Sequence, residues 1–212
     1  MRRTSAGAYL VLASVAFWLS WLLMPGVGVT DTATIFALVG AHRSHVRASV
    51  VLQLLSAALY APGIAAILAA EPARRSAAIR AGGALLAIGA MGSAADAIFH
   101  LVAYEMTAPG IALEAVAPVM RRLQGKDLAL LLPFVAAFFL GHALLVAALR
   151  KRGRVATLGA YVLAAAPLII IVGAPATHAG FATGRLVALA FLGLVAGSLA
   201  LVGLSVMVED GE

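Results

Sequence analysis

The stretch that decides the fold is GGALLAIGAMGSAADAIFHLVAY, residues 82–104. As a helix rising about 1.5 Å per residue, it is long enough to cross the roughly 30 Å hydrocarbon core of a bilayer. It also carries two ionisable residues, Asp96 and His100, whose i, i+4 spacing places them on one helix face. Ionisable side chains are costly in hydrocarbon, so this pair is the first candidate for a functional site.

The composition of the whole chain is that of a polytopic membrane protein. Of 212 residues, 63% are hydrophobic and 11% are charged, with a mean hydropathy of +1.05. A soluble domain has about 45–50% apolar and about 25% charged residues. Long apolar runs without period-two alternation predict a helical bundle rather than a β-barrel. The chain lacks cysteine, which excludes disulfides and thiolate metal sites.

The apolar runs predict a single all-α transmembrane domain of six helices. The first run follows Arg2 and Arg3 but is longer than most signal-peptide cores and has no clean cleavage site, so we expect an uncleaved span. The six predicted spans cover residues 7–24, 46–70, 82–104, 128–149, 155–172 and 186–208.

Two further short helices are expected at the membrane interface. Residues 32–43 form one, with Thr30 or Asp31 as its N-cap. The amphipathic segment 107–126 forms the other and could act as a lid, although Pro118 argues against one continuous helix there.

The basic residues predict the orientation, because cytoplasmic loops are enriched in Lys and Arg. With both termini in the cytoplasm, nine basic residues lie inside and six outside, so we expect a multi-pass protein of the bacterial inner membrane with its short helices on the outer side. The net charge of +6 is then a topology signal, and no nucleic-acid partner is expected. The inner set is Arg2, Arg3, Arg74, Arg75, Arg80, Arg150, Lys151, Arg152 and Arg154, and the outer set is Arg43, Arg47, Arg121, Arg122, Lys126 and Arg185.

In this topology several polar residues fall in the outer half of the second and third spans. Asp96 lies about 10–12 Å below the outer end of its span, and Gln53 lies at a similar depth, roughly 10 Å. We therefore predict an outward-facing polar pocket with Asp96 and His100 as its catalytic residues. Its predicted lining comprises Gln53, Ser56, Tyr60 and Glu105, beneath a roof carrying His42 and His45.

A deeper polar layer is predicted from His142 in the fourth span and Tyr161 in the fifth, each about 10 Å from the inner end. We assign both to the ligand pocket and expect His142 to pair with Tyr161 or Tyr60. Because His100 and His142 lie at different depths, a haem between them is disfavoured.

Three functions remain open. In the first, the pocket binds a small apolar or lipid-like molecule, with Asp96 as proton donor or orienting group and His100 as acid or base. Isomerisation, cyclisation or hydrolysis of a lipidic substrate would be compatible with this site. In the second, His42, His45 and His100, together with Asp96, bind Zn²⁺ or a similar ion at the outer face for hydrolysis.

In the third, the protein is a non-catalytic accessory or assembly subunit whose polar residues only hold helices together. Membrane lipids are its expected surroundings in every case. Gly193 and Gly197 form a GxxxG motif that could support a homodimer.

The segment FFLGHALLVAALRKRGRVATLGAYVLAAAPLI, residues 138–169, carries a Phe-x-x-Gly-His helix, a basic turn and a Leu-Gly span. It resembles a family of short bacterial membrane proteins of about this length, a domain of unknown function. The opening AGAYLVLASVAFWL and residues 47–70 also fit that family's first two spans. The resemblance implies the six-helix fold and no particular activity.

Overall fold

The computed structural model describes residues 3–70, 77–125, 127–150, 153–178 and 183–208. All regular structure in these ranges is helical, and six helical segments are long and apolar enough to cross a membrane, as predicted. The long helices are α1 (Arg3–Leu23), α3 (Arg43–Ala70), α4 (Ala77–Met106), α6 (Leu132–Leu149), α7 (Arg154–His178) and α8 (Gly184–Val208). The short ones are α2 (Thr32–Ala41), α5 (Leu113–Gln124) and the 3₁₀ helix η1 (Asp127–Leu131).

Each predicted span overlaps one long helix, and the predicted and observed bounds differ by at most six residues. The fourth span was predicted from residue 128, but residues 127–131 form η1 and α6 begins at Leu132. Pro133 lies in the first turn of α6, where its missing N–H costs no hydrogen bond. Helix α7, which corresponds to the fifth predicted span, runs through Pro167 and Pro175 to His178, beyond the predicted end at residue 172.

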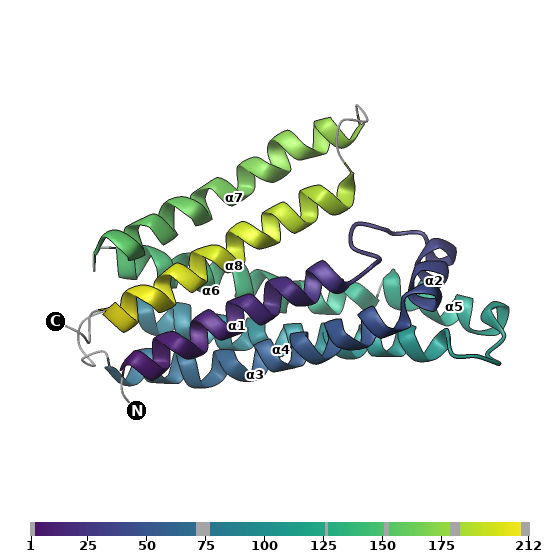
Figure 1. Cartoon of the computed structure of the whole chain (residues 1–212), viewed down its shortest axis with the longest axis horizontal. Coiled ribbons are helices and arrows are strands. Elements are labelled where there is room, and N and C mark those ends of the chain that lie inside the picture. Colours follow the sequence, from purple (N-terminus) through teal and green to yellow (C-terminus); the bar gives the residue numbers. More distant parts are fainter. Residues whose placement is uncertain (1–2, 71–76, 126, 151–152, 179–182, 209–212) are drawn as a thin grey trace.

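The long helices pack in the order α7–α8–α1–α3–α4–α6, while α6 and α7 touch only slightly. Figure 1 shows both ends of the chain on one side of the bundle and the short helices α2 and α5 at the opposite side. We call these two sides the termini end and the cap end, and we call α2, α5 and the loop 24–31 the cap. Helix α7 lies outside α8 and has the smallest buried share of the six long helices.

Glycines bring α4 and α6 to backbone contact in the half of the bundle nearer the termini end. A Cβ atom at Gly82 would lie 2.8 Å from the backbone nitrogen of Leu145 and 3.0 Å from the carbonyl oxygen of Gly141. Gly141 in turn faces the backbone of Leu86, and Gly89 faces the backbone of Phe138. The glycines therefore permit an approach that any side chain would prevent.

Two serines of α3 tie it to α1. Ser49 Oγ donates a hydrogen bond of 2.7 Å to the carbonyl oxygen of Ser20, and Ser56 Oγ donates one of 2.8 Å to that of Ala13. All four residues are buried. Both bonds satisfy a hydroxyl that would be costly to leave without a partner in an apolar interior.

The cap is held together by polar and apolar contacts. Asp31, one of the two predicted N-caps, accepts hydrogen bonds from the backbone N–H of Thr34 at 2.8 Å and from its hydroxyl at 2.7 Å. Thr32 Oγ1 donates to Gln124 Oε1 at 2.6 Å and so joins α2 to α5. Met120 of α5 is buried beside Phe36 of α2.

Helix α5 runs through Pro118 without a break, so the amphipathic helix predicted in this segment is present despite its proline. The apolar face of α5 packs Val116, Ala117 and Met120 against Phe36 and its neighbours. Tertiary packing of this kind contributes most of the stability of a protein helix and here outweighs the hydrogen bond lost at Pro118.

Two arginines fasten the cap end to the bundle. Arg185, at the start of α8, donates to the carbonyl oxygens of Met24, Pro25 and Leu22 at 3.0, 2.9 and 2.8 Å, which caps the carboxyl end of α1. Arg43, at the start of α3, donates to the carbonyl oxygen of Tyr104 at 2.7 Å and lies 3.8 Å over its ring centroid. A cation at a helix carboxyl end also interacts favourably with the helix dipole.

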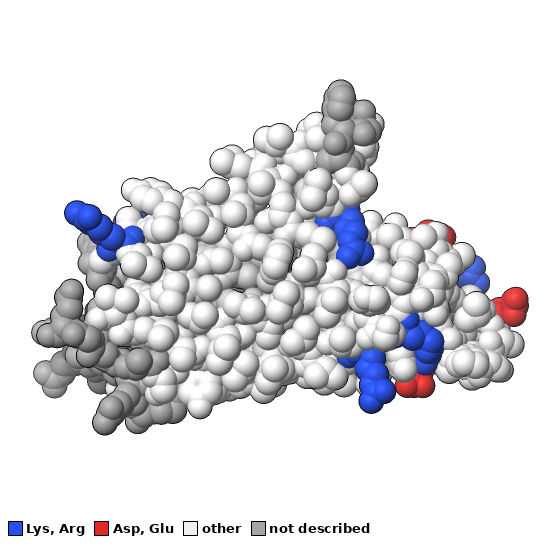
Figure 2. Space-filling view, in the orientation of Figure 1, with Lys and Arg blue, Asp and Glu red and all other residues white. Residues whose placement is uncertain are grey.

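On the face shown in Figure 2, charged side chains of the described residues occur toward the two ends, and a broad uncharged band lies between them. This pattern is the one expected of a bundle that crosses a bilayer. The predicted topology residues Arg2, Arg74, Arg75, Lys126, Lys151 and Arg152, and the acidic tail 209–212, lie outside the described residues.

Candidate functional site

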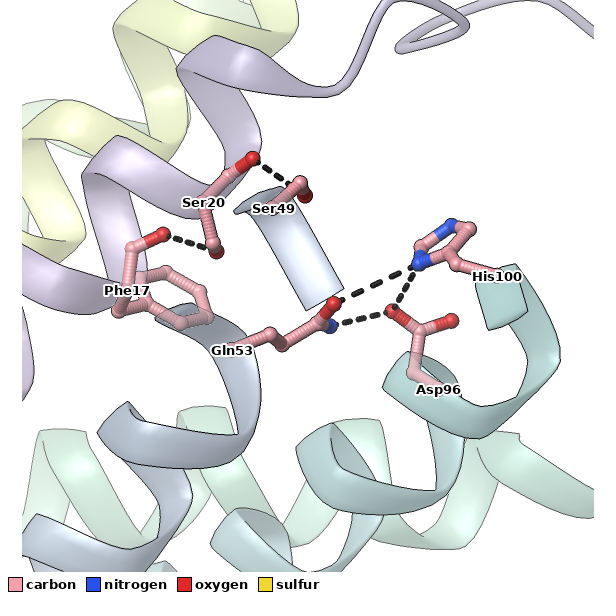
Figure 3. Close-up of polar contacts among 6 residues, drawn as sticks. All are labelled: Phe17, Ser20, Ser49, Gln53, Asp96 and His100. Atoms are coloured by element: carbon pink, nitrogen blue, oxygen red, sulfur yellow. Dashed lines mark hydrogen bonds and ion pairs between the residues drawn. The ribbon is translucent and has the colours of Figure 1, made fainter. Parts of the chain in front are cut away.

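The side chains of Gln53, Asp96 and His100 meet between α3 and α4. Gln53 Nε2 donates a hydrogen bond of 2.7 Å to Asp96 Oδ2, and Gln53 Oε1 lies 3.4 Å from His100 Nδ1. Asp96 Oδ2 and His100 Nδ1 are 3.7 Å apart, too long for a direct hydrogen bond. Figure 3 shows the amide of Gln53 facing both other groups, so that the three contacts form a triangle. We call these three residues the polar cluster.

The amide of Gln53 fixes the direction of this chain of contacts. Its oxygen can only accept and its nitrogen can only donate, so His100 must carry a proton on Nδ1 to bond with it. The other ring nitrogen, Nε2, is then the one that can accept a proton from a bound molecule. Asp96 therefore influences the orientation of His100 through the hydrogen bonds of Gln53 and, more weakly, through the ion-pair contact of 3.7 Å.

The position of Gln53 follows from the α1–α3 packing. It lies one turn after Ser49, and Figure 3 shows the Ser49–Ser20 hydrogen bond beside it. Gln53 is 1% exposed, so its amide has to find partners inside the protein. Asp96 and His100, with side chains 22% and 18% exposed, are partly open to space around the cluster.

Aromatic rings surround His100. The rings of Trp21 and Phe99 lie 5.7 and 5.8 Å from the His100 ring between centroids, both close to edge-on. The indole Nε1 of Trp21 is buried and has no hydrogen-bond partner among the described residues. An unsatisfied buried donor is uncommon and indicates a place where a water molecule or a ligand oxygen would bind.

Two cavities lie beside the polar cluster, and Trp21 and Asp96 line both. The lateral cavity, of about 320 Å³, lies among α1, α3, α4, α6 and α8. Its walls include Leu132 and Val135 of α6, which are 62% and 47% exposed on the outside of the bundle, so the cavity lies close to the lipid-facing surface. The lining of the lateral cavity is Phe17, Trp21, Gln53, Gly89, Gly92, Ser93, Asp96, Leu131, Leu132, Val135, Phe138, Phe139 and Leu192.

The cap cavity, of about 260 Å³, lies between the polar cluster and the cap. His100 lines it together with Met120 and Gln124 of α5 and with Ile35 and Val39 of α2. The loop residues 26–30 complete the wall. Asp96 therefore stands between an apolar cavity at the side of the bundle and a second cavity under the cap.

Three predicted pocket residues lie elsewhere. Ser56 and Tyr60 are buried but line neither of these two cavities, since Ser56 bonds to α1 and the Tyr60 ring packs edge-on against Phe138 at 6.0 Å. Glu105 is exposed on α4 and lines neither cavity. The predicted single polar stripe on the second span is thus divided, because α3 packs against α1 and α4 on different faces.

The predicted pairing of His142 is wrong. His142 is fully buried, and its Nε2 lies 3.2 Å from Ser198 Oγ of α8. Tyr161 is 70% exposed because α7 lies on the outside of α8. The hydroxyl of Tyr60 and the Nδ1 of His142 have no hydrogen-bond partner among the described residues. His142 is therefore an interhelical contact of α6 with α8.

The residues predicted to bind metal are not gathered together. His42 and His45 are exposed, with ring centroids 5.8 Å apart, and they line neither cavity. Within the described parts of the chain, no three His, Asp or Glu side chains are placed to hold a metal ion. The geometry gives no support to the zinc hypothesis.

Gly193 of the GxxxG motif has a neighbour within the chain. A Cβ atom there would lie 2.9 Å from the Trp18 indole nitrogen of α1, so this glycine serves the packing of α8 on α1. A homodimer through Gly193 and Gly197 remains an untested expectation.

Sequence reasoning missed the part that α1 plays in the site. Phe17 and Trp21 line the lateral cavity, but neither is among the predicted pocket residues. The signal available was the i, i+4 spacing of two large aromatic residues on one helix face.

Comparison of the chain with models of protein families, with curated proteins and with solved structures gives no match in any of the three. The resemblance of residues 138–169 to a family of short bacterial membrane proteins therefore rests on the quoted residues alone. The function of the protein is therefore inferred from the geometry of this chain.

Proposed function

We propose that this chain is a multi-pass protein of the bacterial inner membrane that binds a small, largely apolar or lipid-like molecule in the lateral cavity. The polar end of that molecule would lie against the polar cluster. The observation that carries the proposal is the position of Asp96, an ionisable side chain that lines two cavities and shares them with Trp21.

The cost of placing Asp96 within an apolar bundle supports this proposal. Serine hydroxyls already join α1 to α3 at two levels, and glycine contacts join α4 to α6. A carboxylate used only to hold α3 and α4 together would be expected in a dry contact, whereas Asp96 keeps part of its surface open. Ionisable groups within membrane helices that border a cavity commonly mark a binding site.

The arrangement is also compatible with acid–base chemistry on the bound molecule. His100 lines the cap cavity, so its Nε2 is the candidate proton acceptor for a polar end that reaches past Asp96 into that cavity. Asp96 would hold the required tautomer of His100 through the Gln53 amide. Asp96 and His100 thereby keep the catalytic roles predicted for them, with Gln53 as a positioning residue. Isomerisation or hydrolysis of a lipidic substrate would need both groups.

One observation favours the alternative of a non-catalytic accessory subunit. The Gln53–Asp96 hydrogen bond of 2.7 Å joins α3 to α4 directly, as a purely structural contact would. Under this alternative, substitutions in the polar cluster would change the stability of the bundle and nothing else.

The orientation that we propose has both termini in the cytoplasm and the cap on the outer side. The basic residues support it, because the inner side then carries more Lys and Arg than the outer side. Polar molecules would reach the cap cavity from outside, and apolar molecules would reach the lateral cavity from the bilayer.

The test is quenching of Trp21 fluorescence by a brominated medium-chain alcohol in lipid nanodiscs, in a Trp18→Phe background that leaves Trp21 as the only tryptophan. We expect the quenching to saturate as the concentration of the brominated alcohol rises, as binding to a site requires. Val135→Phe should fill the mouth of the lateral cavity and abolish saturation, whereas Leu140→Phe, at a 58% exposed position of the same helix that does not line the cavity, should not. Equal quenching in both variants would contradict a binding site.

A further inference from the structure

We infer that the occupant of the lateral cavity is an amphiphile with a positively charged polar end, such as a protonated amine or a quaternary ammonium group on an apolar body. This inference rests on the proposed function and specifies the ligand of the same site. It concerns the charge of the ligand, which the predicted apolar or lipid-like molecule left open.

The first argument is the charge balance around Asp96. Among the described residues, its one ion-pair partner within 4.0 Å is His100, and Gln53 supplies only a neutral N–H donor. The nearby arginines are engaged elsewhere: Arg43 with Tyr104, and Arg185 with the end of α1. A carboxylate in an apolar interior is costly unless a cation balances its charge, and no Lys or Arg in the described part of the chain pairs with Asp96.

The second argument is the aromatic lining of the lateral cavity. Phe17, Trp21, Phe138 and Phe139 contribute to the walls that also contain Asp96. Aromatic faces attract cations, more strongly when the cation is desolvated, and they are the usual lining of sites for quaternary ammonium ligands. The faces of the same rings would repel an anionic group, because the face of an aromatic ring carries negative partial charge.

The ligand would meet two polar groups in the lateral cavity, the Trp21 N–H and the Asp96 carboxylate. The orphaned Trp21 N–H favours an acceptor on the ligand, but a hydrogen bond between neutral groups is weak. A charge-assisted hydrogen bond from a protonated amine to a carboxylate is roughly twice as strong, and a quaternary ammonium group is attracted to a carboxylate by its charge alone. The carboxylate therefore decides the charge of the ligand, and the indole N–H is left for water or for an oxygen on the same ligand.

The size and position of the cavity limit the body of the ligand. A volume of about 320 Å³ is at the lower end of the roughly 300–1,000 Å³ range of small-molecule sites. Leu132, Val135 and Leu192 supply apolar walls next to the outside of the bundle. A single short chain or a compact ring system fits this space, with its apolar part toward the bilayer and its cation at Asp96.

The experiment compares three brominated amphiphiles with the same alkyl chain and different ends: trimethylammonium, alcohol and sulfate. Quenching of Trp21 is measured in the Trp18→Phe protein in nanodiscs, with Asp96 intact and with Asp96→Asn. Because each probe partitions into the bilayer to the same extent for both proteins, the ratio of their apparent affinities isolates the effect of Asp96. Circular dichroism and gel filtration check that both proteins are folded.

We expect Asp96→Asn to weaken binding of the ammonium probe on the order of tenfold, to change the alcohol little and to leave the sulfate weak. Equal effects of Asp96→Asn on the ammonium and alcohol probes would overturn the inference while leaving the proposed function standing. Absence of saturable quenching by every probe would instead overturn the proposed function itself.

If Asp96→Asn does not fold, the inference is tested by comparing the affinities of the ammonium, alcohol and sulfate probes for the protein with Asp96 intact. Each affinity is then corrected by the measured partition of the probe into protein-free nanodiscs. The inference requires the order ammonium, alcohol, sulfate from strongest to weakest, and unlabelled ammonium amphiphile must displace the brominated alcohol. A corrected affinity for the alcohol equal to or above that of the ammonium would overturn it.

Discussion

The two ends of the α4 helix pass through very different surroundings. Toward the termini end, Gly82 and Gly89 let the backbone of α6 touch that of α4, and polar atoms are few. Toward the cap end, beyond Gly92, the same helix presents Asp96 and His100 to two cavities. The first half is packed to backbone contact, and the second half contains space and polar groups.

This difference indicates a division of labour along one helix. Close packing in the first half holds α4 at a fixed distance from α6 and gives the bundle its stability. The second half can then contain cavities and an ionisable residue, each of which lowers stability locally. Substitutions in the two halves should therefore have effects of different size and kind.

The largest effect is expected from Gly141→Ala, which places a methyl group against the backbone of Leu86 and Gly82. Because backbone atoms cannot move aside, we expect a loss of about 2–3 kcal/mol in the free energy of unfolding. Reversible denaturation in mixed micelles measures this change.

The matched control for that substitution is Gly40→Ala in the cap, where an added Cβ meets nothing within 4 Å. Gly40→Ala should leave the free energy of unfolding unchanged or raise it by at most about 1 kcal/mol. Equal losses in the two variants would contradict the tight packing that we assign to the α4–α6 contact.

An intermediate effect is expected from Arg185→Gln at the cap end. The guanidinium donates three hydrogen bonds, one to the carbonyl oxygen of Leu22 in the last turn of α1 and two to those of Met24 and Pro25 just after it. Charged hydrogen bonds contribute about 1.5–3 kcal/mol in favourable cases. We expect a loss of about 2 kcal/mol, with faster hydrogen exchange confined to the end of α1 and the loop 24–31. Arg185→Lys should recover part of this loss, and no recovery would indicate that shape rather than charge matters.

The smallest effect concerns the N-cap of α2. Hydrogen bonds from the side chain and the backbone of Thr34 lower the pKa of Asp31 below its ordinary value of 3.8. The folded state therefore prefers the carboxylate, so its stabilisation of α2 is complete above about pH 4 and is lost as the pH falls through the lowered pKa. Hydrogen exchange in α2 should accelerate over that acidic range in the unmodified protein.

Asp31→Asn is the control, because asparagine caps a helix without titrating. Its exchange rates, corrected for the intrinsic effect of pH, should stay level over the same range. A change of equal size in both proteins would assign the pH dependence to other groups.

Much of the fold follows from the sequence. Six apolar runs, the short helix after Asp31 and the amphipathic α5 all come from residue periodicity and from length, which the bilayer restricts strongly. The contact of Gln53 with Asp96 and His100 was also indicated, because their depths in adjacent spans agree. Whether these residues bind a ligand stays a prediction.

The lateral order of the helices could not be predicted in the same way. In a membrane, residues facing lipid and residues facing other helices are both apolar, so the sequence does not reveal that α7 lies outermost and exposes Tyr161. The place of Trp21 in the site could not be predicted for the same reason, since nothing in its neighbours along the chain shows that it faces His100 of α4. The division of the Gln53–Ser56–Tyr60 stripe also depends on which helix lies on each side of α3.

The position of α8 between α1 and α7 has a consequence for how the protein is made. The ribosome synthesises α1 well before α8, yet Gly7 of α1 packs directly on Gly203 of α8. The side of α1 that contacts α8 therefore lacks its partner while the four intervening long helices are synthesised. A nascent chain halted before α8 leaves that side of the first helix open to other proteins of the insertion machinery.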